Sequence, residues 1–211
     1  MPIDYKKTDK DLYQPKTTPS IIDVPEMVFI AVDGEGDPNT SAEYKAALEA
    51  LYGLSWTIKM SKTSGTQPEG YFEYVVPPLE GLWWSSDGRM VDYSDKGSFC
   101  WTSMIRQPGF VTPDVFEFTK SVLAKKKPEI DTSKARLMIF SEGLCVQVMH
   151  IGSYDDEPET IAVMEKYAAD NGYAIDISDT RRHHEIYISD PRKIAPEKLK
   201  TVIRHPIRIK G

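Results

Sequence analysis

The sequence predicts an α+β fold built from two similar strand–helix–strand–strand modules, with antiparallel sheets, helices on one side and a ligand cleft between the modules. The predicted elements run strand, helix, strand, strand, and this order occurs twice. The segments "VFIAVDGEGDP" and "CVQVMHIGSYDDEP" also share an arrangement, in which a strand, a glycine turn, acidic residues and a proline precede a helix. We place the modules at about residues 21–110 and 130–211 of a single domain, after a polar N-terminal arm at residues 1–20.

The composition is that of a soluble globular protein, with 40% hydrophobic and 27% charged residues among 211. The net charge of −6 argues against nucleic acid as a partner, because nucleic-acid-binding proteins concentrate positive charge, and it suits a neutral or cationic small molecule. The longest apolar run, at residues 27–32, is too short to cross a membrane, and the polar N-terminal segment does not resemble a signal peptide. We therefore expect a cytoplasmic protein.

Cysteines and histidines do not form a metal-binding pattern in this sequence. Cys100 and Cys145 are the two cysteines, and the four histidines are scattered. In the expected reducing compartment both cysteines are predicted to be free thiols. Neither a metal nor another cofactor is predicted.

The first module begins with an apolar strand at residues 26–32 and continues into a helix. Thr40 and Glu43 stand at capping-box spacing, which predicts the start of that helix. The apolar stripe of the helix is formed by Tyr44, Ala47, Leu48, Leu51 and Tyr52. Gly53 weakens the pattern, and the sequence leaves open whether residues 54–62 continue the helix.

Three extended segments and a second helix complete the first half of the chain. The extended segments are predicted at residues 71–76, 79–84 and 99–106. Thr112 and Pro113 predict a capped helix start. The predicted apolar face of this second helix consists of Val115, Phe118, Val122 and Leu123.

The second module repeats the order of elements. Residues 135–140 and 144–152 are predicted to form a hairpin, and a helix follows at residues 158–170, ended by Asn171 and Gly172. Further strands are predicted at residues 173–178 and 183–189, and a short final helix at residues 195–204. Because alternate side chains of a strand face opposite ways, His183, Glu185, Tyr187 and Ser189 share one row.

The segments "VMHIGSYDDEPETIAVMEKYAADNGY" and "HHEIYISDPRK" resemble the GyrI-like small-molecule-binding family. The resemblance covers about residues 20–209 and includes an H-x-G element at His150 and Gly152 and an E-x-Y element at Glu185 and Tyr187. "YFEYVVPPLEGLWW" and "LYGLSWTIKM" resemble the stand-alone branch of the family, and the chain shows no helix-turn-helix pattern. This implies one GyrI-like domain over residues 21–211.

The resemblance implies binding of bulky aromatic molecules, often cationic, in a pocket whose glutamate corresponds to Glu185. It also implies that some stand-alone members hydrolyse cyclopropane-bearing genotoxic compounds, and that one member inhibits DNA gyrase. We expect burial among aromatic rings to raise the pKa of Glu185, so that this carboxylate can act as a general base. Tyr187 is predicted either to hydrogen-bond the ligand or the attacking water, or to pack at the edge of the core.

The remaining candidate residues are ligand-binding ones, each with a plain structural alternative. His183 stands beside Arg181 and Arg182, which favours the surface, and His150 is as readily a structural histidine as a ligand contact. Aromatic side chains that could stack on a ligand are Trp83, Trp84, Trp101, Tyr71, Tyr52 and Tyr44. Trp83 and Trp84 must face opposite ways, so one of them is expected in the core and the other in the pocket or at the surface.

The resemblance, together with these residues, implies three candidate functions. The first is a hydrolase that opens cyclopropane-type genotoxic or xenobiotic compounds, with Glu185 activating a water molecule. The second is binding and sequestration of aromatic cationic drugs without conversion. The third is interaction with gyrase, for which a charge of −6 over 211 residues is a thin imitation of DNA. The oligomeric state and the natural substrate are left open.

Overall fold

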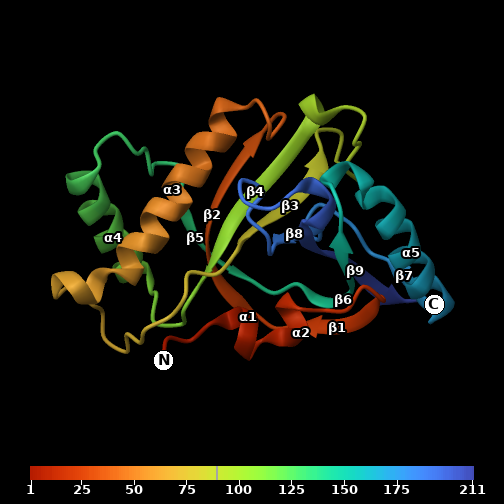
Figure 1. Ribbon diagram of the computed structural model, residues 1–211, viewed down its shortest axis with the longest axis horizontal. Coiled ribbons are helices and arrows are strands. Elements are labelled where there is room, and N and C mark those ends of the chain that lie inside the picture. The colour runs from red at the N-terminus through yellow and green to blue at the C-terminus, as the bar shows by residue number, and fades with distance from the viewer. Residues whose placement is uncertain (89) are drawn as a thin grey trace.

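The computed structural model describes residues 1–88 and 90–211 (Figure 1). The strands in these residues are β1 (Ser20–Val24), β2 (Met27–Glu35), β3 (Leu79–Ser85), β4 (Phe99–Gln107), β5 (Arg136–Phe140), β6 (Gly143–Ile151), β7 (Tyr173–Ile175), β8 (His183–Tyr187) and β9 (Lys200–Ile209). The helices are α1 (Tyr5–Thr8), α2 (Lys10–Tyr13), α3 (Ala42–Lys59), α4 (Pro113–Lys126) and α5 (Glu157–Asp170). None of the helices in the described part of the chain is long and apolar enough to span a membrane.

The sheet confirms the predicted duplication. Its strands are ordered β1-β6-β9-β8-β3-β4-β2-β5, with antiparallel pairing throughout this path, and β7 pairs with β9. The units β2-α3-β3-β4 and β6-α5-β8-β9 therefore occupy equivalent places on either side of the central β3–β8 pair. Each unit also receives an outer strand from the chain that precedes the other unit, since β1 pairs with β6 and β5 pairs with β2. This exchange joins the two modules into one sheet.

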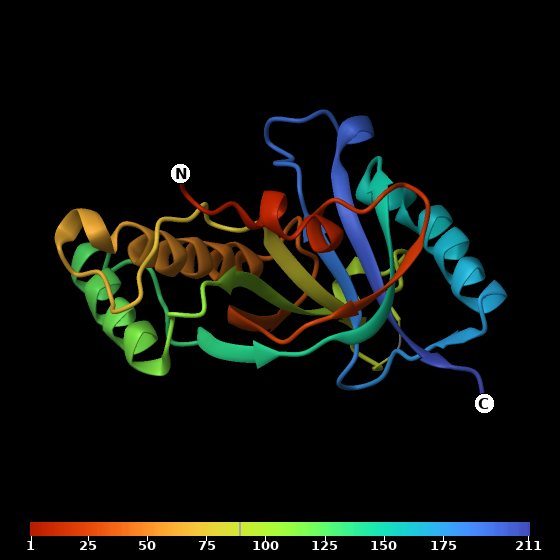
Figure 2. The ribbon, with the colours of Figure 1, turned by 90° about the horizontal axis from the view of Figure 1, so that it is seen from below.

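The two faces of the sheet bury different clusters of side chains. Helices α3 and α5 lie on the same face at opposite ends, and α4 packs beside α3 (Figure 2). Under α3, Ile30 and Ile105 pack with Leu51 in one apolar cluster. On the opposite face, Leu12 and Tyr13 of α2 pack against a second apolar cluster from the same strands. The N-terminal segment is thus packed on the sheet and is not frayed.

Helix α3 answers the question that the sequence left open, because it continues past Gly53 to Lys59. A Cβ atom at Gly53 would lie 3.0 Å from Leu123 Cδ2 of α4, so glycine lets the two helices approach closely. The N-cap is Ser41 and not Thr40, since the Ser41 side chain accepts the Tyr44 backbone N–H. The face of α4 is also rotated from the predicted one: Phe118 is half exposed, and Phe116 is buried.

Three predicted elements are wrong. Segments 135–140 and 144–152 do not form a hairpin, because β5 and β6 pair with strands of different modules. Residues 71–76 form no strand except for a single bridge at Tyr74, since β3 and β2 are already paired on both edges. The predicted final helix at residues 195–204 is one 3₁₀ turn followed by β9. β9 is rich in β-branched residues, which favour a strand, and it pairs with β6 and β8 on its two edges.

Candidate functional site

A cavity of about 1350 Å³ opens on the face that carries α3 and α5. Its lining comes from α3, from β3 and β8 in the centre of the sheet, and from the start of α5. Many of its lining residues are aromatic, among them Tyr44, Tyr52, Trp56, Trp83, Phe99 and Tyr154. Such a volume accommodates a drug-sized molecule, and the rings offer flat stacking surfaces.

Glu185 lies at the floor of the cavity in a fixed orientation. His183 Nε2 donates to Glu185 Oε1 at 2.8 Å, and the Tyr187 hydroxyl donates to Oε2 at 2.6 Å. Trp83 Nε1 in turn donates to the Tyr187 hydroxyl at 2.9 Å. Gly81 pairs with Glu185 across the strands, and a Cβ there would lie 2.5 Å from Trp83 Nε1. The glycine therefore gives the indole the space it needs to reach Tyr187.

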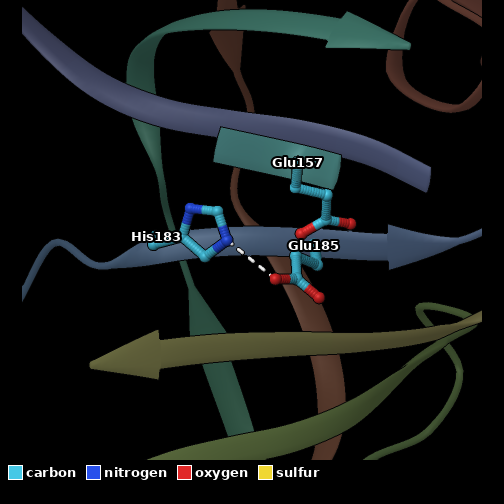
Figure 3. A group of neighbouring side chains, drawn as sticks. All are labelled: Glu157, His183 and Glu185. Carbon is cyan, nitrogen blue, oxygen red and sulfur yellow. Dashed lines mark hydrogen bonds and ion pairs between the residues drawn. The ribbon is translucent and has the colours of Figure 1, made fainter. Parts of the chain in front are cut away.

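Glu157, the first residue of α5, lies beside Glu185 and is fully buried (Figure 3). The Tyr93 hydroxyl donates to Glu157 Oε2 at 3.1 Å, and Oε1 has no hydrogen-bond partner among the described residues. A buried polar atom without a partner is costly, so this oxygen is a place where a polar ligand atom or a water molecule is favoured.

The environments of the two carboxyl groups move their pKa values apart. Burial and the charge of Glu185 raise the pKa of Glu157 well above its ordinary value. Burial opposes ionisation of Glu185 too, but the hydrogen bonds from His183 and Tyr187 and the charge of His183 lower its pKa. The expected rise in the pKa of Glu185 is therefore wrong, and the raised pKa belongs to its neighbour. Of the two carboxyl groups, Glu157 is therefore the one that favours its protonated form and Glu185 the one that favours its ionised form.

The cavity brings together some of the predicted residues. Tyr44, Tyr52, Trp83, Glu185 and Tyr187 line it. His183 does not line the cavity but contacts Glu185, and its expected surface position is wrong because its side chain is 1% exposed.

Four other predicted ligand-binding residues lie outside the cavity lining. Trp101 is fully buried beneath Tyr44, with their rings 5.0 Å apart, and Trp84 faces the opposite side of the sheet, where the Arg182 guanidinium covers its ring. Tyr71 bonds the Lys59 carbonyl at the far end of α3. His150 bonds Thr160 and the Ser153 carbonyl, which is the structural alternative.

Glu157, Tyr93 and Tyr154 line the cavity but were not among the site residues predicted from the sequence. Glu157 stands directly before Pro158, and a carboxylate in a first helical turn is usually explained by the helix dipole. Tyr93 and Tyr154 come from connections between elements, where sequence periodicity gives no signal. The raised pKa of Glu157 depends on Glu185, which is 28 positions away in the chain and meets it only in the folded sheet.

The site contains three residue types that bind metal ions, in Glu157, His183 and Glu185 (Figure 3). One possible ligand atom from each lies within 4.8 Å of the others. However, His183 Nε2 and Glu185 Oε1 are 2.8 Å apart and share a hydrogen bond, whereas two ligands of a tetrahedral zinc ion stand roughly 3.3 Å apart. This contact fits a hydrogen bond better than a pair of zinc ligands, so we expect protons and not a metal at these atoms.

Chelation tests this assignment. Treatment with EDTA, followed by dialysis, is expected to change neither ligand affinity nor any catalysed reaction, because hydrogen bonds already organise the carboxylates. Elemental analysis of the purified protein and a ligand titration before and after treatment provide the measurement. Stoichiometric zinc in the protein, together with loss of binding on chelation, would contradict the assignment.

The duplicated sheet and its aromatic, carboxylate-floored cavity define a small-molecule-binding domain. The profile of the GyrI-like small molecule binding domain matches residues 17–208, and the chain belongs to the GyrI-like family. This confirms the resemblance found in the sequence. No curated protein matches the chain.

Solved structures similar to this chain agree with that placement. A crystal structure described as an uncharacterized conserved protein from Listeria innocua is 49% identical, with 98% of this chain and 100% of that chain covered and a TM-score of 0.93. A structure described as a hydrolase from Listeria innocua is 48% identical over 98% of this chain and 100% of that chain, with a TM-score of 0.91. The EcmrR C-terminal domain, 14% identical with a TM-score of 0.53 over 92% of this chain and 98% of that chain, shares the fold.

Proposed function

We propose that this protein is a hydrolase that opens a strained electrophilic ring, such as a conjugated cyclopropane, in a planar aromatic genotoxic or xenobiotic compound. The observation that carries the proposal is the pair of adjacent buried carboxyl groups at the floor of an aromatic cavity, where Glu157 has a raised pKa and the hydrogen-bonded Glu185 a lowered one. Neighbouring groups whose pKa values are driven apart are typical of acid–base sites. Two structures from Listeria innocua, each 48% identical, are described as hydrolases, which supports the same class of activity.

Glu185 is the proposed general base. A water molecule donates a hydrogen atom to Glu185 and accepts the carboxyl proton that Glu157 holds on its otherwise unpartnered Oε1, which leaves a second lone pair of the water oxygen for the ligand. The water oxygen bonds to a cyclopropane carbon, a ring C–C bond breaks, and its electron pair moves into the conjugated system and onto the carbonyl oxygen. The water proton passes to Glu185, which returns it to bulk water after the product leaves, and the phenolate or enolate oxygen of the product takes up one proton from bulk water. The net change is addition of one water molecule.

A hydrogen-bond donor is needed for the charge that develops on the carbonyl oxygen. Tyr154 lines the cavity, and its ring lies against Tyr187 with centroids 5.7 Å apart. Burial, reinforced by the charge of Glu185, raises the pKa of Tyr154 to about 12, so its phenol stays protonated and can donate. We assign this role to Tyr154.

Mass spectrometry tests the proposal directly. Purified protein incubated with a cyclopropane-containing alkylating compound is expected to convert it to a product heavier by one water molecule. Protein that binds the compound but leaves its mass unchanged would contradict the hydrolase proposal.

The same observations support a second candidate, sequestration of aromatic cations. Glu185 would then supply only a countercharge inside the aromatic lining. In that case affinity should be higher for a cation than for a neutral molecule of the same shape, and Glu185→Gln should remove the difference. Equal affinities in the wild-type protein would argue against this candidate.

Tyr187→Phe is expected to slow hydrolysis by roughly 10–100-fold at mildly acidic pH, because it removes a hydrogen bond to an ionised carboxylate. Without the Tyr187 hydroxyl the pKa of Glu185 rises, so the acid limb of the rate profile moves to higher pH. Rates measured from pH 5 to pH 9 show this shift. Tyr167→Phe, which removes a phenol from α5 outside the site, is the matched control. A profile that superimposes on that of the wild type would exclude this role for Tyr187.

A further inference from the structure

A chain of hydrogen bonds leads from the cavity floor through the sheet to the solvent beside α5. His183 Nε2 contacts Glu185 Oε1 at 2.8 Å, His183 Nδ1 contacts His205 Nε2 at 2.7 Å, and His205 Nδ1 contacts Glu165 Oε1 at 3.1 Å. The side chains of His183 and His205 are 1% and 0% exposed, whereas that of Glu165 is 33% exposed. The inner end of this hydrogen-bond chain is therefore shielded from solvent, and its outer end at Glu165 is in contact with solvent.

The sheet places these residues in line. His184 pairs with Arg204 across β8 and β9, so His183 and His205 are the next cross-strand neighbours and lie on the face that carries α5. Their rings are 4.9 Å apart and nearly perpendicular, which directs one ring nitrogen at the other. Glu165 projects from α5 and meets His205 from outside.

Counting protons along the chain gives its charge. The three contacts each need one proton, and two neutral imidazoles carry only two. When all three contacts are hydrogen bonds and both ends of the chain are carboxylate oxygens, the histidine pair holds one additional proton, shared across the 2.7 Å contact between the rings. Without that proton, one of the three contacts lacks its hydrogen atom, and only at the contact with Glu165, which is 33% exposed, can a water molecule replace it.

We infer that the His183–His205 pair is a proton store that discharges to solvent through Glu165 when Glu185 takes up a proton. The inference rests on the proposed role of Glu185 as a base. When the water proton reaches Glu185 Oε2, His205 Nδ1 gives its proton to Glu165, which releases it to bulk water. Oε1 of the now neutral Glu185 still accepts the His183 N–H. When the product leaves, Glu185 returns its proton to water in the open cavity, and the pair regains one through Glu165.

This exchange keeps the net charge of the buried site constant while a ligand excludes water from the cavity. An uncompensated change of charge in such surroundings is strongly opposed. The groups that act on the charge of His205 are His183, Glu165 and Glu142, and burial lowers its pKa while Glu165 opposes this. His205 therefore gives up its proton readily. Those that act on Glu185 are His183, Tyr187 and Glu157.

His205→Gln and Glu165→Gln test the store without requiring turnover. The side-chain amide of His205→Gln can still donate to His183 but cannot titrate. Glu165→Gln changes a partly exposed helix residue and is expected to keep the fold, so this variant decides alone if His205→Gln does not fold. Carbon-13 NMR of glutamate side-chain carboxyls, with the Glu185 signal assigned by its loss in Glu185→Gln, follows the protonation of Glu185. Both variants are expected to raise its apparent pKa by about one unit, because the compensating positive charge is lost.

Glu159→Gln, an exposed carboxylate on the same helix, is the control and should leave the titration unchanged. If Glu185 titrates as in the wild type in both relay variants, the inference is wrong whatever the catalytic activity. If its titration shifts but no cyclopropane compound is hydrolysed, the proton store stands and the proposed hydrolase activity fails. With an active enzyme, the rate in both variants should fall roughly tenfold at mildly acidic pH and recover as the pH rises.

Discussion

Replacing Glu185 with glutamine is expected to lower the rate of ring opening by roughly 10²–10⁴-fold while leaving the affinity for a neutral aromatic ligand nearly unchanged. Glutamine has the shape of glutamate, so its oxygen can still accept the His183 N–H that fixes the side chain. It cannot take a proton from water, which is the step that the ionised carboxylate supplies. Product formation measured by mass spectrometry and binding measured by quenching of cavity tryptophan fluorescence separate the two effects.

A matched control comes from Glu49, an exposed carboxylate on the lining of the same cavity. Glu49→Gln removes the same charge from the cavity without touching its floor, so hydrolysis should stay close to the wild-type rate. Undiminished hydrolysis in Glu185→Gln would refute a base at this position. Loss of affinity for cations alone, with no hydrolysis in either protein, would favour sequestration.

The row that contains Glu185 was predictable from sequence because a strand alternates its side chains with a period of two. His183, Glu185 and Tyr187 therefore had to share a face wherever the strand was placed. The partners of that row were not predictable in the same way. Glu157 enters from a helix start, and His205 and Glu165 meet only because β9 lies beside β8 and α5 covers that face. The direction of the Glu185 pKa shift depends on hydrogen bonds from His183, Tyr187 and Glu157, whose geometry the alternation of the strand does not give, and this is why burial alone gave the wrong sign.

The duplicated topology could also be predicted, because the order of strands and helices repeats along the chain. The exchange of β1 and β5 between modules could not. A short apolar segment such as residues 136–140 pairs equally well with any free edge, and its position is decided by contacts distant in sequence. Glu142 makes such contacts. It lies in the predicted hairpin turn, yet its side chain is buried and contacts His184 and Arg204 in a network of charged groups.

The network lies on the face of the sheet opposite the cavity, where it links the strands to α2. Arg204 Nη1 donates to Glu142 Oε2 at 2.8 Å, and His184 bridges Glu142 and Glu80 at 3.0 and 3.1 Å. Arg204 also donates to the Leu12 carbonyl of α2, and the Tyr13 hydroxyl donates to Glu80. All of these groups are buried, so each charge depends on its partner.

Glu142→Gln is expected to destabilise the protein by about 3–5 kcal/mol, because it leaves Arg204 buried without its carboxylate. Urea unfolding at pH 6 gives the measurement. Arg204→Met alone leaves Glu142 as an uncompensated buried charge, so it should also be costly. The double variant Glu142→Leu, Arg204→Met removes both charges and should recover much of the loss. Additive losses in the double variant would show that the ion pair is not the source of the effect.

The same network fixes how stability depends on pH. Burial opposes the charge of Glu142, but His184 and Arg204 lower its pKa from 4.5 to about 2. Its contribution is therefore present above pH 4.5 and is lost as the pH falls toward 2. Burial also opposes the charge of His184, yet Glu142 and Glu80 raise its pKa from 6.5 to about 9, so its contribution is present below pH 6.5 and is lost as the pH rises through 9. The free energy of unfolding should be highest between these windows, and Glu142→Gln should flatten both slopes. A variant whose stability falls as steeply as that of the wild type at both ends would assign the pH dependence to other groups.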